Sequence, residues 1–156
     1  MRKFVAVLAL SVSLLVAKPF GVGSPLQALN DYRYETQHGR QMKIPRSTRL
    51  VVIAFEKETG ALVNDFLNTK DPFYMPKHRA VFIADINKMP TIITNLFALP
   101  KMQKYKHLAY LHYDEEFQNI IPHKEEKITL VRIKDEKVEK ISYISTREEL
   151  KEAIQQ

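Results

Sequence analysis

The segment ITLVRIKDEKVEKISYISTREELKEAI, residues 128–154, contains two strand-like runs and a helix in close succession. Residues 128–133 and 138–144 alternate along the chain, so that every second side chain falls on the same face, which is typical of strands. The charged residues 134–137 lie between the two runs and predict a turn. The two runs therefore form an antiparallel hairpin.

A helix is expected directly after this hairpin. Thr146 with Glu149 three residues later forms a capping-box pattern, in which each side chain bonds a backbone N–H of the other residue. Leu150 and Ile154 then share one side of the expected helix and form its inner face.

Three further apolar runs predict strands in the middle of the chain. RLVVIAF (49–55) and AVFIA (80–84) are continuous and rich in β-branched residues, as in strands that are buried on both faces. HLAYLHY (107–113) is the third run. Two helical patterns separate these strands, and parallel neighbours need such a crossover, so the sequence predicts a parallel core.

The two crossover helices are expected to cover this core. The first starts at residues 59–60 and continues to about residue 68. The second starts after Met89–Pro90, with Pro100 as its end. Its predicted inner face consists of four apolar residues, Ile92, Ile93, Leu96 and Phe97.

The first 17 residues have the pattern of a signal peptide. A basic start is followed by the fourteen-residue apolar run 4–17, which is short for a membrane-spanning helix. Cleavage is expected after Ala17 or as late as residue 23, and residues 24–156 are expected to form one domain. The sequence therefore predicts export to a bacterial periplasm without a permanent membrane anchor; an uncleaved signal anchor is the alternative.

Composition restricts the classes of function. The 156 residues are 45% hydrophobic and carry a formal net charge of +6. Basic residues are mixed with acidic ones, which indicates solvated surfaces and no nucleic-acid partner. The chain has no cysteine, so it has no disulfide framework and no cysteine-ligated metal site.

Three stretches together resemble the thioredoxin-like superfamily, of the peroxiredoxin and cytochrome-maturation-thioredoxin type. They are SPLQALNDYRYETQHGRQMKI (24–44) with a turn at His38–Gly39, RLVVIAF with the following helix, and residues 128–154. The resemblance implies an α/β, three-layer fold. Its mixed sheet would have central parallel strands and a C-terminal antiparallel hairpin followed by a helix.

This chain departs from that superfamily where the superfamily's chemistry lies. At the corner between the first core strand and its helix, redox members carry Cys-x-x-Cys or one peroxidatic Cys. Here the corner reads Glu56, Lys57, Glu58, Thr59, Gly60. Redox members also place a cis-proline before the closing hairpin, and Pro122 is the nearest candidate. Thiol–disulfide exchange and thiol peroxidase activity are thus excluded for this chain alone.

The corner from Glu56 to Gly60, with Pro122, is the predicted binding site. Ligands of open α/β sheets bind at the carboxyl ends of parallel strands, and helix N–H groups there favour anions. The alternative is a charged loop in which Thr59 caps the helix.

A weaker candidate is a metal site of His112, Asp114 and His123, since two nitrogens and a carboxylate could hold zinc or iron. The alternative is that these histidines are scattered over the surface. No nucleotide-binding or metalloprotease motif occurs, and no cofactor is expected.

The expected function is that of a redox-inactive, thioredoxin-fold protein of the periplasm that binds a protein or envelope component. Pairing of edge strands would allow a homodimer. Two alternatives stay open: a cofactor- or metal-dependent oxidoreductase on the same fold, and a scaffold whose partner supplies the thiol.

Overall fold

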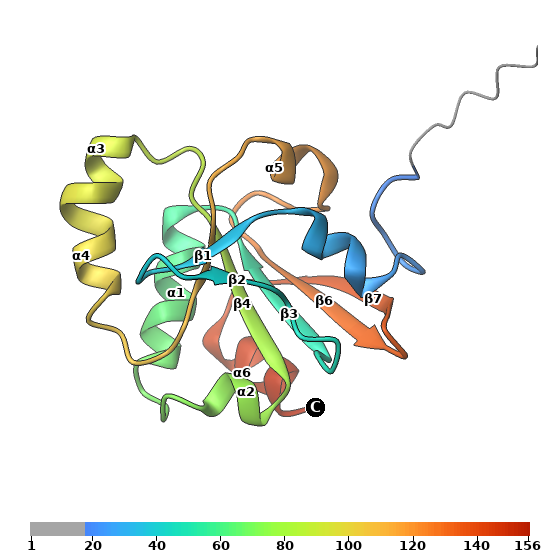
Figure 1. Ribbon diagram of the computed structural model, residues 1–156. Helices are drawn as coiled ribbons and strands as arrows, with labels where there is room; N and C mark the ends of the chain where they lie inside the picture. Colours follow the sequence, from blue (N-terminus) through green and yellow to red (C-terminus); the bar gives the residue numbers. More distant parts are fainter. Residues whose placement is uncertain (1–17) are drawn as a thin grey trace, which may run out of the picture.

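The computed structural model describes residues 18–156, so the predicted signal peptide lies outside the described residues. Within this range seven strands form one mixed sheet in the order β2-β1-β5-β4-β3-β6-β7 (Figure 1). The strands are β1 (Tyr34–Thr36), β2 (Gln41–Met42), β3 (Leu50–Ala54), β4 (Ala80–Asp85), β5 (Tyr110–His112), β6 (Ile128–Lys134) and β7 (Lys137–Ile144).

The centre of the sheet is parallel, as the sequence predicts. β3 pairs with β4 and β4 with β5 in parallel, whereas β6 pairs antiparallel with both β3 and β7. On the far side β1 pairs antiparallel with β5 and with β2. The expected mixed sheet with a closing antiparallel hairpin is confirmed.

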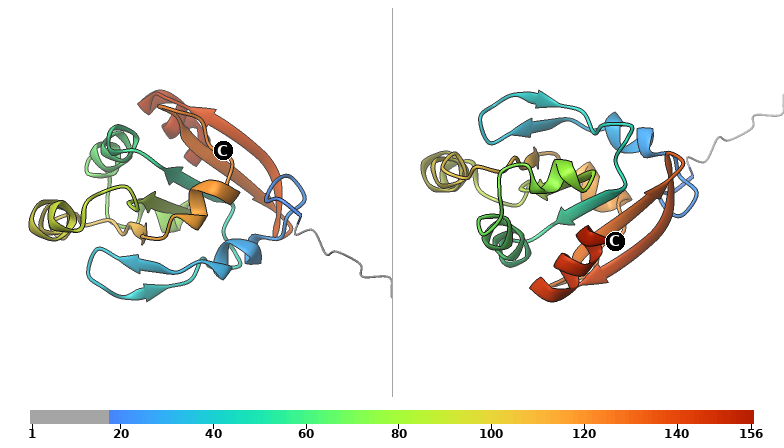
Figure 2. Two further views of the ribbon diagram at one scale, coloured as in Figure 1. Left: turned by 90° about the horizontal axis from the view of Figure 1, so that it is seen from above. Right: turned by 90° about the horizontal axis from the view of Figure 1, so that it is seen from below.

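Helices cover both faces of this sheet (Figure 2). One face carries α1, α2, α6 and a longer helix of three consecutive segments, which we call the 91–102 helix. The other face carries α5 and the 3-10 helix η1. The bounds are η1 (Leu26–Asp31), α1 (Lys57–Leu67), α2 (Tyr74–Lys77), α3 (Thr91–Ile93), the π-helical η2 (Thr94–Ala98), α4 (Leu99–Met102), α5 (Glu116–Ile120) and α6 (Arg147–Gln155).

A hydrophobic layer lies on each side of the sheet. Val52 and Phe82 point into the layer beneath α1 and α6, and Ile53 and Ile83 point into the layer beneath η1 and α5. All residues of β3 and β4 are buried. Burial on both faces, which the continuous apolar runs predict, is therefore confirmed.

The predicted turns and caps are present at the C-terminal end. Asp135 and Glu136 both have positive φ (51° and 59°), the backbone of a type I′ hairpin turn between β6 and β7. In α6 the Thr146 hydroxyl accepts the N–H of Glu149, and the Glu149 carboxylate accepts the N–H of Thr146. The hairpin and the capping box are both confirmed.

Helix ends and short elements depart from the predictions. Pro100 does not end its helix, which continues to Met102. Just before the proline the N–H of Leu99 bonds the carbonyl of Thr94, five residues back, and this wider turn lets the helix pass a residue without an N–H. The short helices α2 and α5 are additional to the predicted elements, and β5 is shorter than the predicted run 107–113.

The 91–102 helix also faces the other way from its predicted orientation. The four apolar side chains of the predicted inner face point to solvent, with exposed fractions of 69% for Ile92, 44% for Ile93, 65% for Leu96 and 64% for Phe97. Thr94 is buried instead, and Ala98 and Met102 are half-buried. The expected inner face was wrong because periodicity groups residues on one side of a helix without saying which side meets the sheet.

No helix within residues 18–156 has the length and apolar character needed to cross a membrane.

Candidate functional site: a groove at the ends of the parallel strands

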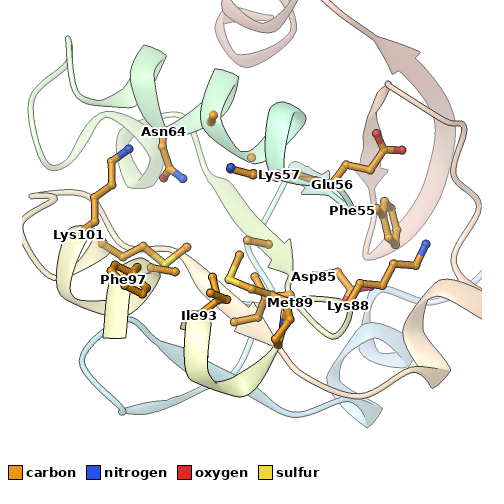
Figure 3. Close-up of a pocket in the computed structure, with 18 of the residues that line it drawn as sticks. Phe55, Glu56, Lys57, Asn64, Asp85, Lys88, Met89, Ile93, Phe97 and Lys101 are labelled. Carbon is orange, nitrogen blue, oxygen red and sulfur yellow. The ribbon is translucent and has the colours of Figure 1, made fainter. Parts of the chain in front are cut away.

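A groove of about 620 Å³ lies between α1 and the 91–102 helix (Figure 3). Its floor is formed at the carboxyl ends of β3 and β4, by Ala54 and Ala84 among others. These strand ends are where open α/β sheets bind ligands, and the volume falls in the range of small-molecule pockets. The remaining lining residues are Phe55, Glu56, Lys57, Gly60, Ala61, Asn64, Asp85, Ile86, Lys88, Met89, Pro90, Ile93, Phe97, Ala98, Lys101, Met102 and Tyr105.

The groove is apolar inside and basic around its opening. Met89, Ile93 and Phe97 line one wall from the 91–102 helix and the turn before it, and Figure 3 shows them opposite α1. Three exposed lysines, Lys57, Lys88 and Lys101, are also lining residues. None of the three takes part in any ion pair within residues 18–156. The site thus combines an apolar interior with unpaired positive charge.

The two acidic lining residues are already held by the protein. The Glu56 carboxylate accepts the N–H of Glu126 at 3.0 Å and 3.2 Å. The Asp85 carboxylate accepts bonds from the amide and the backbone N–H of Asn87, and its burial raises its pKa. The three lysines outnumber these two carboxylates, so the charge of the lining is positive overall.

The predicted corner lies at one end of this groove. Glu56, Lys57 and Gly60 line it, whereas Glu58 and Thr59 do not. Glu58 is exposed, and Thr59 is buried, with its hydroxyl accepting the N–H of Glu56 and donating to the Glu56 carbonyl. The helix therefore begins at Lys57, earlier than predicted, because Glu56 occupies its N-cap position. Thr59 is the third residue of the helix and bonds back to the N-cap, so it takes part in the cap without being the N-cap that the alternative interpretation expected.

The loop that contains Pro122 lies near this corner but outside the groove. The Pro122 carbonyl accepts the hydroxyl of Thr129, and the ring of His123 packs on Phe55 at 4.7 Å between ring centres. All peptide bonds within residues 18–156 are trans. Pro122 therefore does not have the cis geometry that the resemblance implied for a proline at this place.

The structure does not bring the three candidate metal ligands together. His112 is buried against Tyr32, Tyr34 and Phe117, and its Nδ1 lies 2.9 Å from the carbonyl of Arg33. Asp114 and His123 are exposed, and within the described part of the chain no group of three His, Asp or Glu side chains is placed to hold a metal ion. The separation arises because β5 ends at His112, so Asp114 does not continue the strand face.

A buried polar pair at the far end of the groove escaped the sequence analysis. The Nε2 of His107 lies 2.9 Å from Oδ1 of Asn64, and the ring of Tyr105 stacks on the His107 ring. Burial lowers the pKa of His107 to about 4, so the ring is neutral near pH 7. Asn64 follows Gly60 by one helical turn, and this spacing could have placed both residues on the groove side of α1.

Comparisons with known proteins find similar solved structures. No family model matches the chain, and no curated protein does. Among solved structures, a candidate protein disulfide isomerase from Bacteroides thetaiotaomicron is 15% identical, with 90% of this chain and 87% of that chain covered and a TM-score of 0.52. StoA from Bacillus subtilis is 14% identical over 78% and 94% of the two chains, at a TM-score of 0.47. A thioredoxin-like protein from Aeropyrum pernix is 12% identical, with 83% of this chain and 92% of that chain covered and a TM-score of 0.46.

The fold and the sequence together define the class of protein. The chain has a thioredoxin-like fold, and it contains no cysteine. Glu56 and Lys57 stand at the strand-to-helix corner where the resemblance placed a thiol.

Proposed function

We propose that this chain is an exported, redox-inactive protein of the thioredoxin fold that acts in the periplasm by binding a protein or envelope component, and that the groove is its binding site. The observation that carries the proposal is the groove itself: an apolar cavity of about 620 Å³ at the ends of β3 and β4. The signal-peptide pattern of residues 1–17 supports the compartment.

The chemistry of the lining supports binding rather than catalysis of thiol exchange. Carboxylates, amines and hydroxyls cannot form the mixed disulfide on which that exchange depends. An apolar interior with a few polar groups at its edge instead favours a ligand by burial of apolar surface.

The same lining indicates the chemistry of the ligand. The unpaired lysines at positions 57, 88 and 101 favour an anionic group at the opening of the groove. We therefore favour an amphiphile, with an apolar chain in the groove and a carboxylate or phosphate among the lysines.

Gly60 is a suitable position for a substitution that fills the groove. A Cβ at this position would meet nothing within 4 Å, and Gly60 lies inside α1, where other residues form helix more readily. Gly60→Phe therefore adds a large side chain at the lining of the groove, from a Cβ position that is open. Gly60→Ala is the matched control, since it also replaces the glycine within the helix but adds only one methyl group.

The test is titration of the purified exported form with a dansyl-labelled undecanoic acid, followed by fluorescence. We expect saturable binding that Gly60→Phe weakens at least about tenfold and Gly60→Ala leaves within about twofold. Circular dichroism and thermal unfolding would verify that both variants are folded. Absence of binding by the unmodified protein, or equal binding by both variants, would refute the groove as the site.

A further inference from the structure

The outward face of the 91–102 helix is an apolar surface without a partner. Nine large hydrophobic side chains are exposed within residues 18–156, and four of them, Ile92, Ile93, Leu96 and Phe97, lie on this one helix. The face that meets the sheet carries the buried Thr94, and Leu99 and Met102 pack against the core from the last turn of the helix. The helix therefore has a second apolar face that is open to solvent, unlike a helix that only covers a core.

The charged residues of the sequence segment that contains this helix have one sign. No Asp or Glu occurs between Asp85 and Asp114, whereas Lys88, Lys101, Lys104 and Lys106 fall in that interval. The rest of the chain carries 20 Lys and Arg against 18 Asp and Glu, so most of the net charge of +6 belongs to this segment. All four lysines are exposed, and none takes part in an ion pair within the described residues.

We propose that the outward face of the 91–102 helix docks on an anionic lipid surface. Lysines precede and follow the helix, so they can reach lipid phosphates while the apolar side chains enter the interface. Basic residues at an anionic membrane strengthen such binding, and a helix with this composition is typical of peripheral attachment. The charge pattern favours this occupant over a second copy of the chain, because two copies would bring like charges together.

Docking would also bring the groove to the lipid surface. Ile93 and Phe97 are both exposed and groove-lining, so the apolar face continues into the groove (Figure 3). The proposal goes beyond the proposed function and does not depend on it, because Ile92 and Leu96, two of its apolar contacts, do not line the groove.

The absence of cysteine permits a position-specific test. The chain with Leu96→Cys carries one thiol, which can be labelled with an environment-sensitive nitrobenzoxadiazole dye. A matched control label goes on Glu139→Cys, because β7 lies on the opposite side of the molecule from the 91–102 helix in both Figure 1 and Figure 2. Position-specific labels also distinguish docking through this helix from attachment through the N-terminal segment.

The probes are vesicles of phosphatidylcholine alone and of phosphatidylcholine mixed with phosphatidylglycerol. We expect a blue shift of the label at position 96 with the anionic vesicles only, and no shift at position 139. Lys104→Gln with Lys106→Gln should weaken binding about 25-fold, at roughly fivefold for each lysine. Lys137→Gln with Lys140→Gln on β7 removes the same charge elsewhere and should change binding less than about threefold.

Three results would overturn the proposal. They are an equal shift with both kinds of vesicle, no shift at position 96 although the protein sediments with vesicles, and burial of the label in a dimer without vesicles. Ile92→Ser with Leu96→Ser gives an independent measurement in the unlabelled protein, since both side chains are exposed and should not be needed for folding. Retention of vesicle binding by this double variant would also contradict docking through this face.

Discussion

At the scale of single residues, the buried His107 is integrated into the protein by several hydrogen bonds. Its Nε2 faces Oδ1 of Asn64, and its carbonyl accepts the side-chain amide of Gln37 at 2.7 Å. The Gln37 side chain also accepts the N–H of Ala109. Because the ring is buried, a second proton on His107 would place a charge in the interior.

This burial predicts a loss of stability in mild acid. The pKa of His107 is about 4 in the folded protein and about 6.5 in an unfolded chain. Between these values the unfolded state binds more protons, so the free energy of unfolding should fall as the pH decreases from 6.5 to 4, by at most about 3 kcal/mol.

Urea unfolding at pH 7.5 and pH 4.5 measures this effect, with His107→Gln as the comparison, since glutamine can still donate to Asn64. The variant should lose less stability than the unmodified protein over this interval. Burial raises the pKa of Asp85. This shift makes the free energy of unfolding increase as the pH falls, but it is present in both proteins and does not affect their difference. An identical pH dependence in the two proteins would contradict the assignment to His107.

At the scale of elements, the turn of the β6–β7 hairpin has a backbone conformation that its residue types do not favour. Its turn residues Asp135 and Glu136 both have positive φ, a conformation that Asn and Gly adopt at lower cost. The register of the hairpin is nevertheless maintained, because Ile128 and Leu130 face one hydrophobic layer while Val131 and Ile133 face the other.

Replacing the turn by Asp135→Asn with Glu136→Gly should therefore raise the free energy of unfolding by about 1 kcal/mol. The change removes the ion pair between Arg46 and Glu136, but that pair is exposed and contributes little. Glu136→Ala is the control, since it removes the same ion pair and keeps a side chain at positive φ. Thermal unfolding should show a gain for the double variant alone, and an equal gain for Glu136→Ala would refute the explanation.

At the scale of the whole molecule, stability comes from the two layers that enclose the sheet and not from the outward face of the 91–102 helix. Phe82 lies in the layer beneath α1 and is 1% exposed, whereas Phe97 is 64% exposed. The same type of side chain thus lies in the core at position 82 and on an unpartnered surface at position 97.

These two phenylalanines allow a matched comparison. Phe82→Ala should lower the free energy of unfolding by about 3–5 kcal/mol, because it leaves a cavity between the sheet and its helices. Phe97→Ala should change it by less than about 0.5 kcal/mol, as expected for a surface substitution. Chemical denaturation of both variants measures the difference, and a loss of several kcal/mol for Phe97→Ala would show that the 91–102 helix packs by its apolar face after all.

Much of the fold could be predicted from local pattern. Continuous apolar runs predict β3 and β4 because a strand buried on both faces needs apolar residues at every position, and Thr146 with Glu149 predicts the start of α6 because the cap depends on four adjacent residues. The candidate site could be predicted only in part. Glu56, Lys57 and Gly60 are close in sequence and follow one strand, but Met89, Phe97 and Tyr105 reach the groove from other parts of the chain.

The sequence by itself determined the chemistry and the elements: a chain without cysteine cannot exchange disulfides, and periodicities of two and 3.6 residues specify strands and helices. Only the tertiary structure decided how the elements face one another. It turned Ile92 and Leu96 to solvent, and it separated His112 from Asp114 by ending β5. It also paired Asn64 with His107 across 43 residues. The physical reason is that hydrophobic periodicity is a property of one segment, whereas orientation and contact depend on all the segments that pack around it.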